Sequence, residues 1–198
     1  ILGLVDITTQ LLHQKYFELS IILIEEFFIF FLFEVKFIYQ IKNLNTTIDN
    51  ILISVGGGGL VSGIGSTLKQ IFPHINIIGV EPNGAKGMTD SLKKNVPLDK
   101  VEIDSIADSL CAPLHMPYSF DVASKVIDQM INISDQDMIE SMKFAFKNLK
   151  LFLEPACVAG FAALKKMNSS KLINQNTLIL LCGSNIDTQS WKQMIKTP

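Results

Sequence analysis

Residues 54–65 read SVGGGGLVSGIG, with four consecutive glycines between an apolar run and a segment of helical spacing. The apolar run before the glycines, residues 48–55, has the length of a buried strand. The helical segment extends to residue 72, and Pro73 is expected to end it. A second apolar run of strand length, INIIGVE, follows over residues 75–81. A strand, a helix and a strand in this order are typical of a βαβ unit, and predict an α/β fold whose twisted, mostly parallel sheet carries helices on both faces.

The rest of the ordered part alternates between helical and strand patterns. We expect a helix over 85–95, a loop with one short element over 96–117, helices over 134–150 and 154–167, and a strand over 177–182. Ser134 begins the second of these helices and Asp137 follows three residues later, which predicts a capping box. The apolar face of that helix is expected to consist of Met138, Met142, Ala145, Phe146 and Leu149.

Residues 1–45 differ in composition from residues 46–198, and we expect the two to be separate parts. Within the first part, residues 21–40 read IILIEEFFIFFLFEVKFIYQ and are dense in Phe and Ile. Charged side chains interrupt this run as far as Lys36, so the uncharged stretch is short for a membrane span. Three interpretations stay open for this run: a buried helix or strand pair, a weak membrane segment, and translated noncoding sequence.

The composition is that of a globular protein. The 198 residues are 48% hydrophobic and 18% charged, with a formal net charge of -2. Neither sign of charge dominates, so nothing favours nucleic acid or an anionic membrane as a partner. The three cysteines, Cys111, Cys157 and Cys182, are odd in number and widely spaced, which argues against a disulfide framework or a zinc site. We therefore expect a reducing compartment, the cytoplasm.

A glycine loop between a strand and a helix exposes several backbone N–H groups at the positive end of the helix dipole. Because a Cβ would keep a ligand away from this backbone, residues 56–59 predict a phosphate site. A P-loop does not fit, since no Lys followed by Ser or Thr comes after the last glycine. A dinucleotide site stays open, because Glu81 ends the next strand where it could bind a ribose hydroxyl. Against that site, Ser62 replaces its third glycine and Pro82 follows Glu81 at once.

Five motifs, VGGGGLVSGIG, GVEPNGAKGM, IADSL, LEPACVAGFAAL and LCGSNID, occur in this order within residues 48–190. Together they resemble the pyridoxal-phosphate enzymes of the tryptophan synthase β fold, in the branch of threonine/serine dehydratases and serine racemases. Residues 106–120, IADSLCAPLHMPYSF, are most similar to the dehydratases. The resemblance covers the C-terminal half of such an enzyme, and implies that residues 46–198 form part of its cofactor domain.

The resemblance also implies roles for particular residues around pyridoxal 5′-phosphate. The cofactor phosphate would lie against Gly56, Gly57, Gly58, Gly59 and Leu60. Cys182 would face the pyridine nitrogen, and Glu154 would stand near the cofactor. A neutral thiol at Cys182 would leave that nitrogen largely unprotonated, which suits β-elimination better than transamination.

A metal site is implied only in part. Members of this branch often bind Mg²⁺ or Ca²⁺, and Glu81 with the Ala85 carbonyl matches two of the ligand positions. The third ligand is usually an acid, at the position where this chain has Gly87. The three histidines, His13, His74 and His115, show no metal or triad spacing and are expected on the surface or in packing.

The chemistry of the family needs a Schiff-base lysine, which its members carry in an N-terminal motif similar to S-x-K-x-R-G-A. That motif does not occur in the 198 residues, and Lys15 and Lys42 have different neighbours. We therefore expect a fragment of a threonine/serine ammonia-lyase that acts on small hydroxy amino acids, is inactive as this chain, and belongs to enzymes that often form homodimers. Three alternatives stay open: a serine racemase-like enzyme fragment, a non-catalytic relic that binds a phosphate ligand or a partner, and a dinucleotide-binding module.

Overall fold

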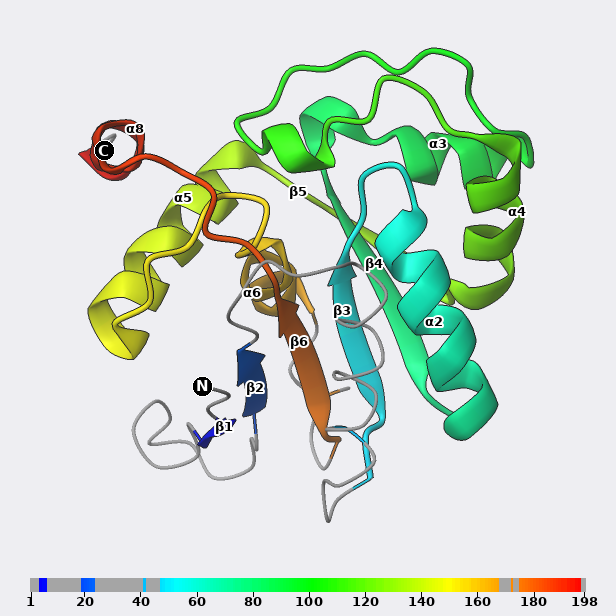
Figure 1. Ribbon diagram of the computed structural model, residues 1–198, viewed down its shortest axis with the longest axis horizontal. Coiled ribbons are helices and arrows are strands. Elements are labelled where there is room, and N and C mark those ends of the chain that lie inside the picture. The colour runs from blue at the N-terminus through cyan, green and yellow to red at the C-terminus, as the bar shows by residue number, and fades with distance from the viewer. Residues whose placement is uncertain are drawn as a thin grey trace.

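The computed structural model describes residues 4–6, 19–23, 41, 47–167, 172 and 175–196. These residues form an α/β fold in which one sheet separates two layers of helices (Figure 1). In this part of the chain the strand order is β1-β2-β6-β3-β4-β5. β1 runs antiparallel to β2, and the other neighbouring pairs are parallel. The predicted fold class is therefore confirmed.

The strands are β1 (Leu4–Asp6), β2 (Leu19–Leu23), β3 (Asn50–Ser54), β4 (Asn76–Pro82), β5 (Gln129–Ile133) and β6 (Thr177–Leu181). β3 lies between β4 and β6, with Asn50 opposite both Asn76 and Thr177. Ile51 and Ile53 of β3 face one hydrophobic core and Leu52 faces the other. Burial on both faces explains why this strand is an unbroken apolar run in the sequence.

Helices cover both faces of the sheet (Figure 1). α2 (Gly59–Ile71), α3 (Gly87–Lys94) and α4 (Pro117–Val126) pack on the face of Ile51, and α5 (Asp135–Phe144), α6 (Ala159–Lys166) and α8 (Thr188–Lys196) pack on the face of Leu52. Short 3₁₀ turns cover Asn83–Ala85 and Asp108–Leu110. The predicted βαβ unit is thus β3–α2–β4, and α2 ends at Ile71, just before Pro73.

Some elements differ from the sequence-based expectation. Three elements of the structure, α4, β5 and α8, are not predicted from the sequence. β5 is hard to recognise because its first four residues keep part of their surface exposed, so no apolar run marks it. Pro117 opens α4, where a proline is tolerated because the N–H group at that position has no helical acceptor. The helix expected from residue 154 begins only at Ala159, because residues 155–158 form a turn.

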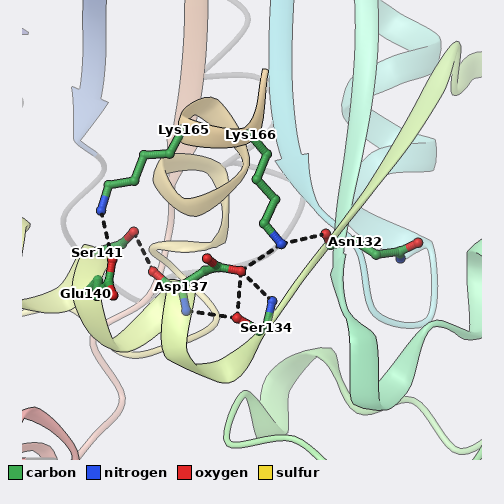
Figure 2. A network of polar contacts seen from close by, with 7 residues as sticks. All are labelled: Asn132, Ser134, Asp137, Glu140, Ser141, Lys165 and Lys166. Atoms are coloured by element: carbon green, nitrogen blue, oxygen red, sulfur yellow. Dashed lines mark hydrogen bonds and ion pairs between the residues drawn. The ribbon is translucent and has the colours of Figure 1, made fainter. Parts of the chain in front are cut away.

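The start of α5 carries the predicted capping box, which is confirmed. Asp137 N–H donates to Ser134 Oγ at 3.2 Å, and Ser134 N–H donates to Asp137 Oδ2 at 2.8 Å. The same Oδ2 pairs with Lys166 Nζ of α6 at 2.7 Å (Figure 2). Partial burial opposes the charge of Asp137, but the contacts with Lys166 and Ser134 hold its pKa below the ordinary value. These contacts connect the end of α6 to the start of α5.

The expected apolar face of α5 is correct at four positions and wrong at one. Met138, Met142 and Ala145 are buried, and Leu149 packs against the same core. Phe146 is instead 49% exposed. α5 ends at Phe144 and continues as a π turn over Ala145–Leu149, whose wider turn shifts later residues around the helix axis. The Phe146 ring therefore packs against the edge of the fold, 4.8 Å from the ring of Trp191 between centroids.

Of residues 1–45, the structure describes β1, β2 and Ile41. β2 pairs in parallel with β6, from Leu19 opposite Thr177 to Leu23 opposite Leu181, and β1 pairs with β2, so this part of the chain supplies two strands to the sheet. Residues 24–40, which hold most of the Phe-rich run, lie outside the described residues. The division of the chain after residue 45 stays a prediction. Among the described helices, none has the length and apolar character needed to cross a membrane.

Replacement of Ser134 by Ala tests the capping box. We expect S134A to lower the free energy of unfolding by about 1 kcal/mol, because the Asp137 N–H group loses its acceptor. Urea denaturation measures the change. S124A is the matched control, since Ser124 lies inside α4, is partly exposed, and donates its hydroxyl to the Asp121 carbonyl one turn earlier instead of capping a helix. Equal unfolding midpoints for S134A and S124A would contradict the assigned cap.

Candidate functional site

The glycine loop and the segment after β6 lie at the same edge of the sheet, because β3 and β6 are parallel neighbours. Residues 56–59 lead from β3 into α2 on one face, whereas residues 182–187 lead from β6 to α8 on the other (Figure 1). Connections that leave adjacent strands toward opposite faces open a crevice at the carboxyl ends, where ligands of open α/β sheets bind. The candidate site is therefore the region between the carboxyl ends of β3 and β6.

The glycines of the loop meet different surroundings. Gly58 has a left-handed backbone, with φ at 89°, and a Cβ there would lie 2.8 Å from Met88 Cε. A Cβ on Gly56 would lie 3.0 Å from the backbone oxygen of Ser109. A Cβ on Gly59 would meet no heavy atom of the described structure within 4 Å. Packing within the protein therefore explains Gly56 and Gly58, whereas the side of Gly59 is open.

Among the described residues, no side chain caps the amino end of α2. In the described structure, no side chain accepts a hydrogen bond from its first turn, and that turn contains no acidic residue. Ser62 N–H donates to Gly58 O at 3.0 Å, so the N–H groups of residues 59–61 precede the first helical bond. The Leu60 side chain packs against the core, and its N–H group is one of these three. Uncapped donors and the helix dipole together give this end of α2 the geometry of an anion site.

His115 contacts the glycine loop, and this contact is not predicted from the sequence. Expected on the surface or in packing, it is buried, with 4% of its surface exposed. Its Nε2 lies 3.2 Å from Gly56 O, and its Nδ1 lies 2.9 Å from Ser91 Oγ of α3. A single His has no sequence signal for such a contact, because only the folded chain brings residue 115 beside residue 56. His74 is exposed, and His13 lies outside the described residues.

Glu154 bridges two loops of the candidate site. Its Oε2 accepts a hydrogen bond from Asn185 N–H at 2.7 Å, and its Oε1 lies 3.4 Å from Ser109 Oγ. Burial raises the pKa of the carboxyl group, while the bond from Asn185 opposes that rise. Gly183 leaves room for the carboxylate, because a Cβ there would collide with Glu154 Oε1. Glu154 therefore holds the segment after β6 beside the loop that contains Ser109.

Cys182 follows β6 directly and is half-buried. Burial, and then the nearby charge of Glu154, raise the pKa of its thiol to about 11. The thiol is therefore uncharged at neutral pH. Burial raises the pKa of Cys157 as well, with a further contribution from Cys182. All three cysteines are free thiols.

Glu81 is buried at the end of β4 and caps α3. Its Oε1 accepts a hydrogen bond from Thr89 N–H at 2.7 Å, and its Oε2 accepts one from Met88 N–H at 3.1 Å. Asn132 Nδ2 lies 3.4 Å from the same Oε1. Burial raises the pKa of the Glu81 carboxyl group, against the lowering effect of these bonds. A carboxylate in this position also benefits from the dipole of α3.

This arrangement does not favour a cation at Glu81. A hard cation needs several free oxygen ligands, and both carboxylate oxygens of Glu81 already accept hydrogen bonds. Ala85 lies in the 3₁₀ turn between β4 and α3. The described part of the chain holds no group of three His, Cys, Asp or Glu side chains placed for a metal ion. Mg²⁺ or Ca²⁺ at Glu81 and Ala85 remains a prediction from resemblance. The same two hydrogen bonds also argue against Glu81 as the acceptor for a ribose hydroxyl.

The sequence profile of one family, described as pyridoxal-phosphate dependent enzyme, matches residues 29–183. A phenylserine dehydratase from Ralstonia pickettii is 35% identical over 144 residues, which are 73% of this chain and 44% of that protein. The chain thus spans less than half the length of this relative.

Solved structures show the same likeness. The processed form of threonine deaminase isoform 2 from Solanum lycopersicum has a TM-score of 0.71 and 29% identity, over 80% of this chain and 46% of that one. Maize serine racemase has a TM-score of 0.68 and 28% identity, over 82% of this chain and 50% of that one. The fold of the covered part of the chain is therefore similar to that of both solved structures.

Alanine substitution distinguishes Gly58, which is fixed by packing, from Gly59, whose Cβ position is open. We expect G58A to lower the free energy of unfolding by about 1–3 kcal/mol, because a Cβ at positive φ is strained and would press on Met88. We expect G59A to leave stability unchanged or to raise it by about 0.5 kcal/mol, since Ala favours helix at an open position. Urea denaturation of both variants measures the difference. Equal destabilisation by the two changes would show that Gly59 is also fixed by packing.

Proposed function

The chain belongs to the family of pyridoxal-phosphate dependent enzymes, and we propose that it forms the phosphate-binding part of a lyase that acts on small hydroxy amino acids. The proposed reaction is that of a threonine/serine ammonia-lyase, which eliminates the β-hydroxyl group and yields a 2-oxo acid and ammonia. One observation carries the proposal: the uncapped amino end of α2 behind the open side of Gly59, at the sheet edge that also holds Cys182. The dehydratase and deaminase among the relatives support the reaction type.

The phosphate group would bind at the amino end of α2. Gly57 and Gly59 are exposed, and their N–H groups, with those of residues 60 and 61, would donate to phosphate oxygens. Gly56 and Gly58 would act indirectly, because their lack of a Cβ lets the loop approach Ser109 and Met88. The bound phosphate would supply the negative charge that the first turn of α2 lacks.

The pyridine ring would lie toward the end of β6. Pyridoxal phosphate, when bound, supplies an electron sink for the α-carbon of an amino acid. We place its ring nitrogen beside Cys182, whose thiol is neutral because its pKa is about 11. A neutral thiol cannot form an ion pair with a protonated nitrogen, so the ring nitrogen would stay largely unprotonated. An unprotonated ring nitrogen suits β-elimination better than transamination. Glu154 would support the site by holding the backbone of Asn185, three residues after Cys182.

We propose that the 198-residue chain binds the cofactor without turnover. The lysine motif that the resemblance implies does not occur in its sequence. The ion-paired lysines of the described residues also lie outside the candidate site. Their partners are Asp90, Asp121, Asp128, Asp137 and Glu140. A racemase-like activity of the whole protein is the second candidate, supported by the likeness to maize serine racemase. A homodimer and a cytoplasmic location stay predictions.

An acidic side chain at Gly59 tests the phosphate site. We expect G59D to weaken binding of pyridoxal phosphate by about tenfold or more, because its carboxylate would occupy the anion position at the helix end. Calorimetric titration measures the affinity, and urea denaturation should show retained stability, since an acid in the first turn favours the helix. Q70E is the matched control, because it adds the same charge at the exposed far end of α2. Equal affinities of G59D and wild type would refute the proposed site.

Chemical labelling of Cys182 tests the position of the ring. With a pKa of about 11, its reaction with iodoacetamide should accelerate by about a hundredfold between pH 8 and pH 10, as the thiolate fraction rises. Bound pyridoxal phosphate should protect Cys182 at pH 10, whereas pyridoxal phosphate should protect it little in G59D. Peptide mass spectrometry measures the labelling of each cysteine. Labelling that is unaffected by the cofactor would place the ring elsewhere.

A further inference from the structure

We propose that His115 is a positioning residue for the phosphate loop, in which its imidazole fixes the carbonyl group of Gly56 and thereby aims the N–H group of Gly57. The inference rests on the proposed function, because it concerns the same anion site. It concerns a residue for which neither the glycine motif nor the family resemblance implies a role.

His115 contacts three segments, two through its imidazole and one through its backbone. Its Nε2 lies 3.2 Å from Gly56 O, at the start of the glycine loop, and its Nδ1 lies 2.9 Å from Ser91 Oγ in α3. Its backbone N–H donates to Leu98 O at 2.7 Å, in the loop after α3. Both His115 and Ser91 are buried, with 4% and 0% of their surfaces exposed. The ring therefore has little freedom to take another position.

The partners determine which ring nitrogen carries the proton. A backbone carbonyl can only accept, so Nε2 must donate to Gly56 O. In the neutral ring, Nδ1 then accepts from the hydroxyl of Ser91, and Ser91 Oγ in turn accepts from Leu98 N–H at 3.2 Å. All hydrogen bonds in this series run in one direction, from Leu98 to Gly56. Burial, which lowers the pKa of His115, agrees with the neutral form.

The contact with Gly56 matters because a peptide unit is planar and trans. The carbonyl group of Gly56 and the N–H group of Gly57 belong to one such unit and point in opposite directions. A peptide unit between two glycines can rotate more freely than any other, because neither residue has a Cβ. The imidazole removes this freedom by holding the carbonyl, so the Gly57 N–H group points away from His115. A donor that is oriented before the ligand arrives binds with a smaller entropy cost.

The position of Gly87 supports the role of the ring. A Cβ on Gly87 would lie 2.7 Å from His115 Cε1 and 2.7 Å from Val101 Cγ2, so the ring and Val101 together occupy the space that a side chain at residue 87 would need. The family resemblance implies an acidic metal ligand at this position. In this chain the His115 ring and an acidic side chain at residue 87 could not occupy this space together, and the imidazole that lies there reaches the glycine loop.

Two amide variants separate the two contacts of the ring. The amide nitrogen of Gln reaches as far as Nε2 and can donate to Gly56 O, whereas the shorter Asn reaches only as far as Nδ1 and Ser91. We expect H115N to weaken binding of both pyridoxal phosphate and inorganic phosphate by about tenfold, and H115Q to restore affinity to within about threefold of wild type. Calorimetric titration measures affinity, and urea denaturation of the same samples measures stability. H74N is the control for a His-to-Asn change, because His74 is exposed.

The outcomes are distinct. Wild-type affinity in H115N, or equal loss in H115N and H115Q that follows their loss of stability, would reduce His115 to a packing residue and overturn the inference. If H115N does not fold, H115M replaces it; this side chain fills similar space but cannot donate to Gly56 O, so it should weaken phosphate binding while H115Q does not. If wild type binds neither pyridoxal phosphate nor phosphate, the proposed function fails, and the inference fails with it. Binding by wild type with no effect of H115N overturns the inference alone.

Discussion

The position of β3 constrains the rest of the structure. This strand pairs with β4 on one edge and with β6 on the other, and its side chains are buried on both faces. Because both edges of β3 are occupied, the chain must leave the plane of the sheet after Ser54, and it turns within a few residues into α2. Gly58 makes that turn possible through its left-handed backbone, and Gly56 permits the close approach of Ser109. The same turn leaves the amino end of α2 uncapped and open beside Gly59. Residues 56–59 thus make both the turn from β3 into α2 and the open helix end that could bind an anion.

Much of the fold follows from local sequence patterns. The β3–α2–β4 unit has apolar runs and glycines at the positions where the structure has them, and Ser134 with Asp137 marks the cap of α5 correctly. The misses also have physical causes. β5 is half-exposed and therefore lacks an apolar run, and the π turn after Phe144 changes the helical period on which the position of Phe146 was based. Periodicity predicts elements that are regular and buried, and fails where either condition is absent.

The candidate site could be predicted only in part. The glycine loop was visible from chemistry alone, whereas Cys182 and Glu154 entered through resemblance to a family. The structure brings Glu154 against the segment that follows Cys182, through its bond with Asn185. His115 had no signal, because its contact with Gly56 joins residues 59 positions apart through packing of the loop that precedes α4. Glu81 shows the reverse case: a residue with a suggestive motif is used to cap α3.

The most direct measurement uses the small number of glycines in the chain, 12 in 198 residues. In a sample labelled with ¹⁵N only at glycine, titration with pyridoxal phosphate reports on each glycine N–H group separately. We predict that the signals of Gly57 and Gly59 move downfield, as expected for donors to a phosphate group, while those of Gly65, Gly79 and Gly160 stay in place. An unchanged spectrum, or shifts that are confined to glycines outside residues 56–59, would contradict a phosphate site at the amino end of α2.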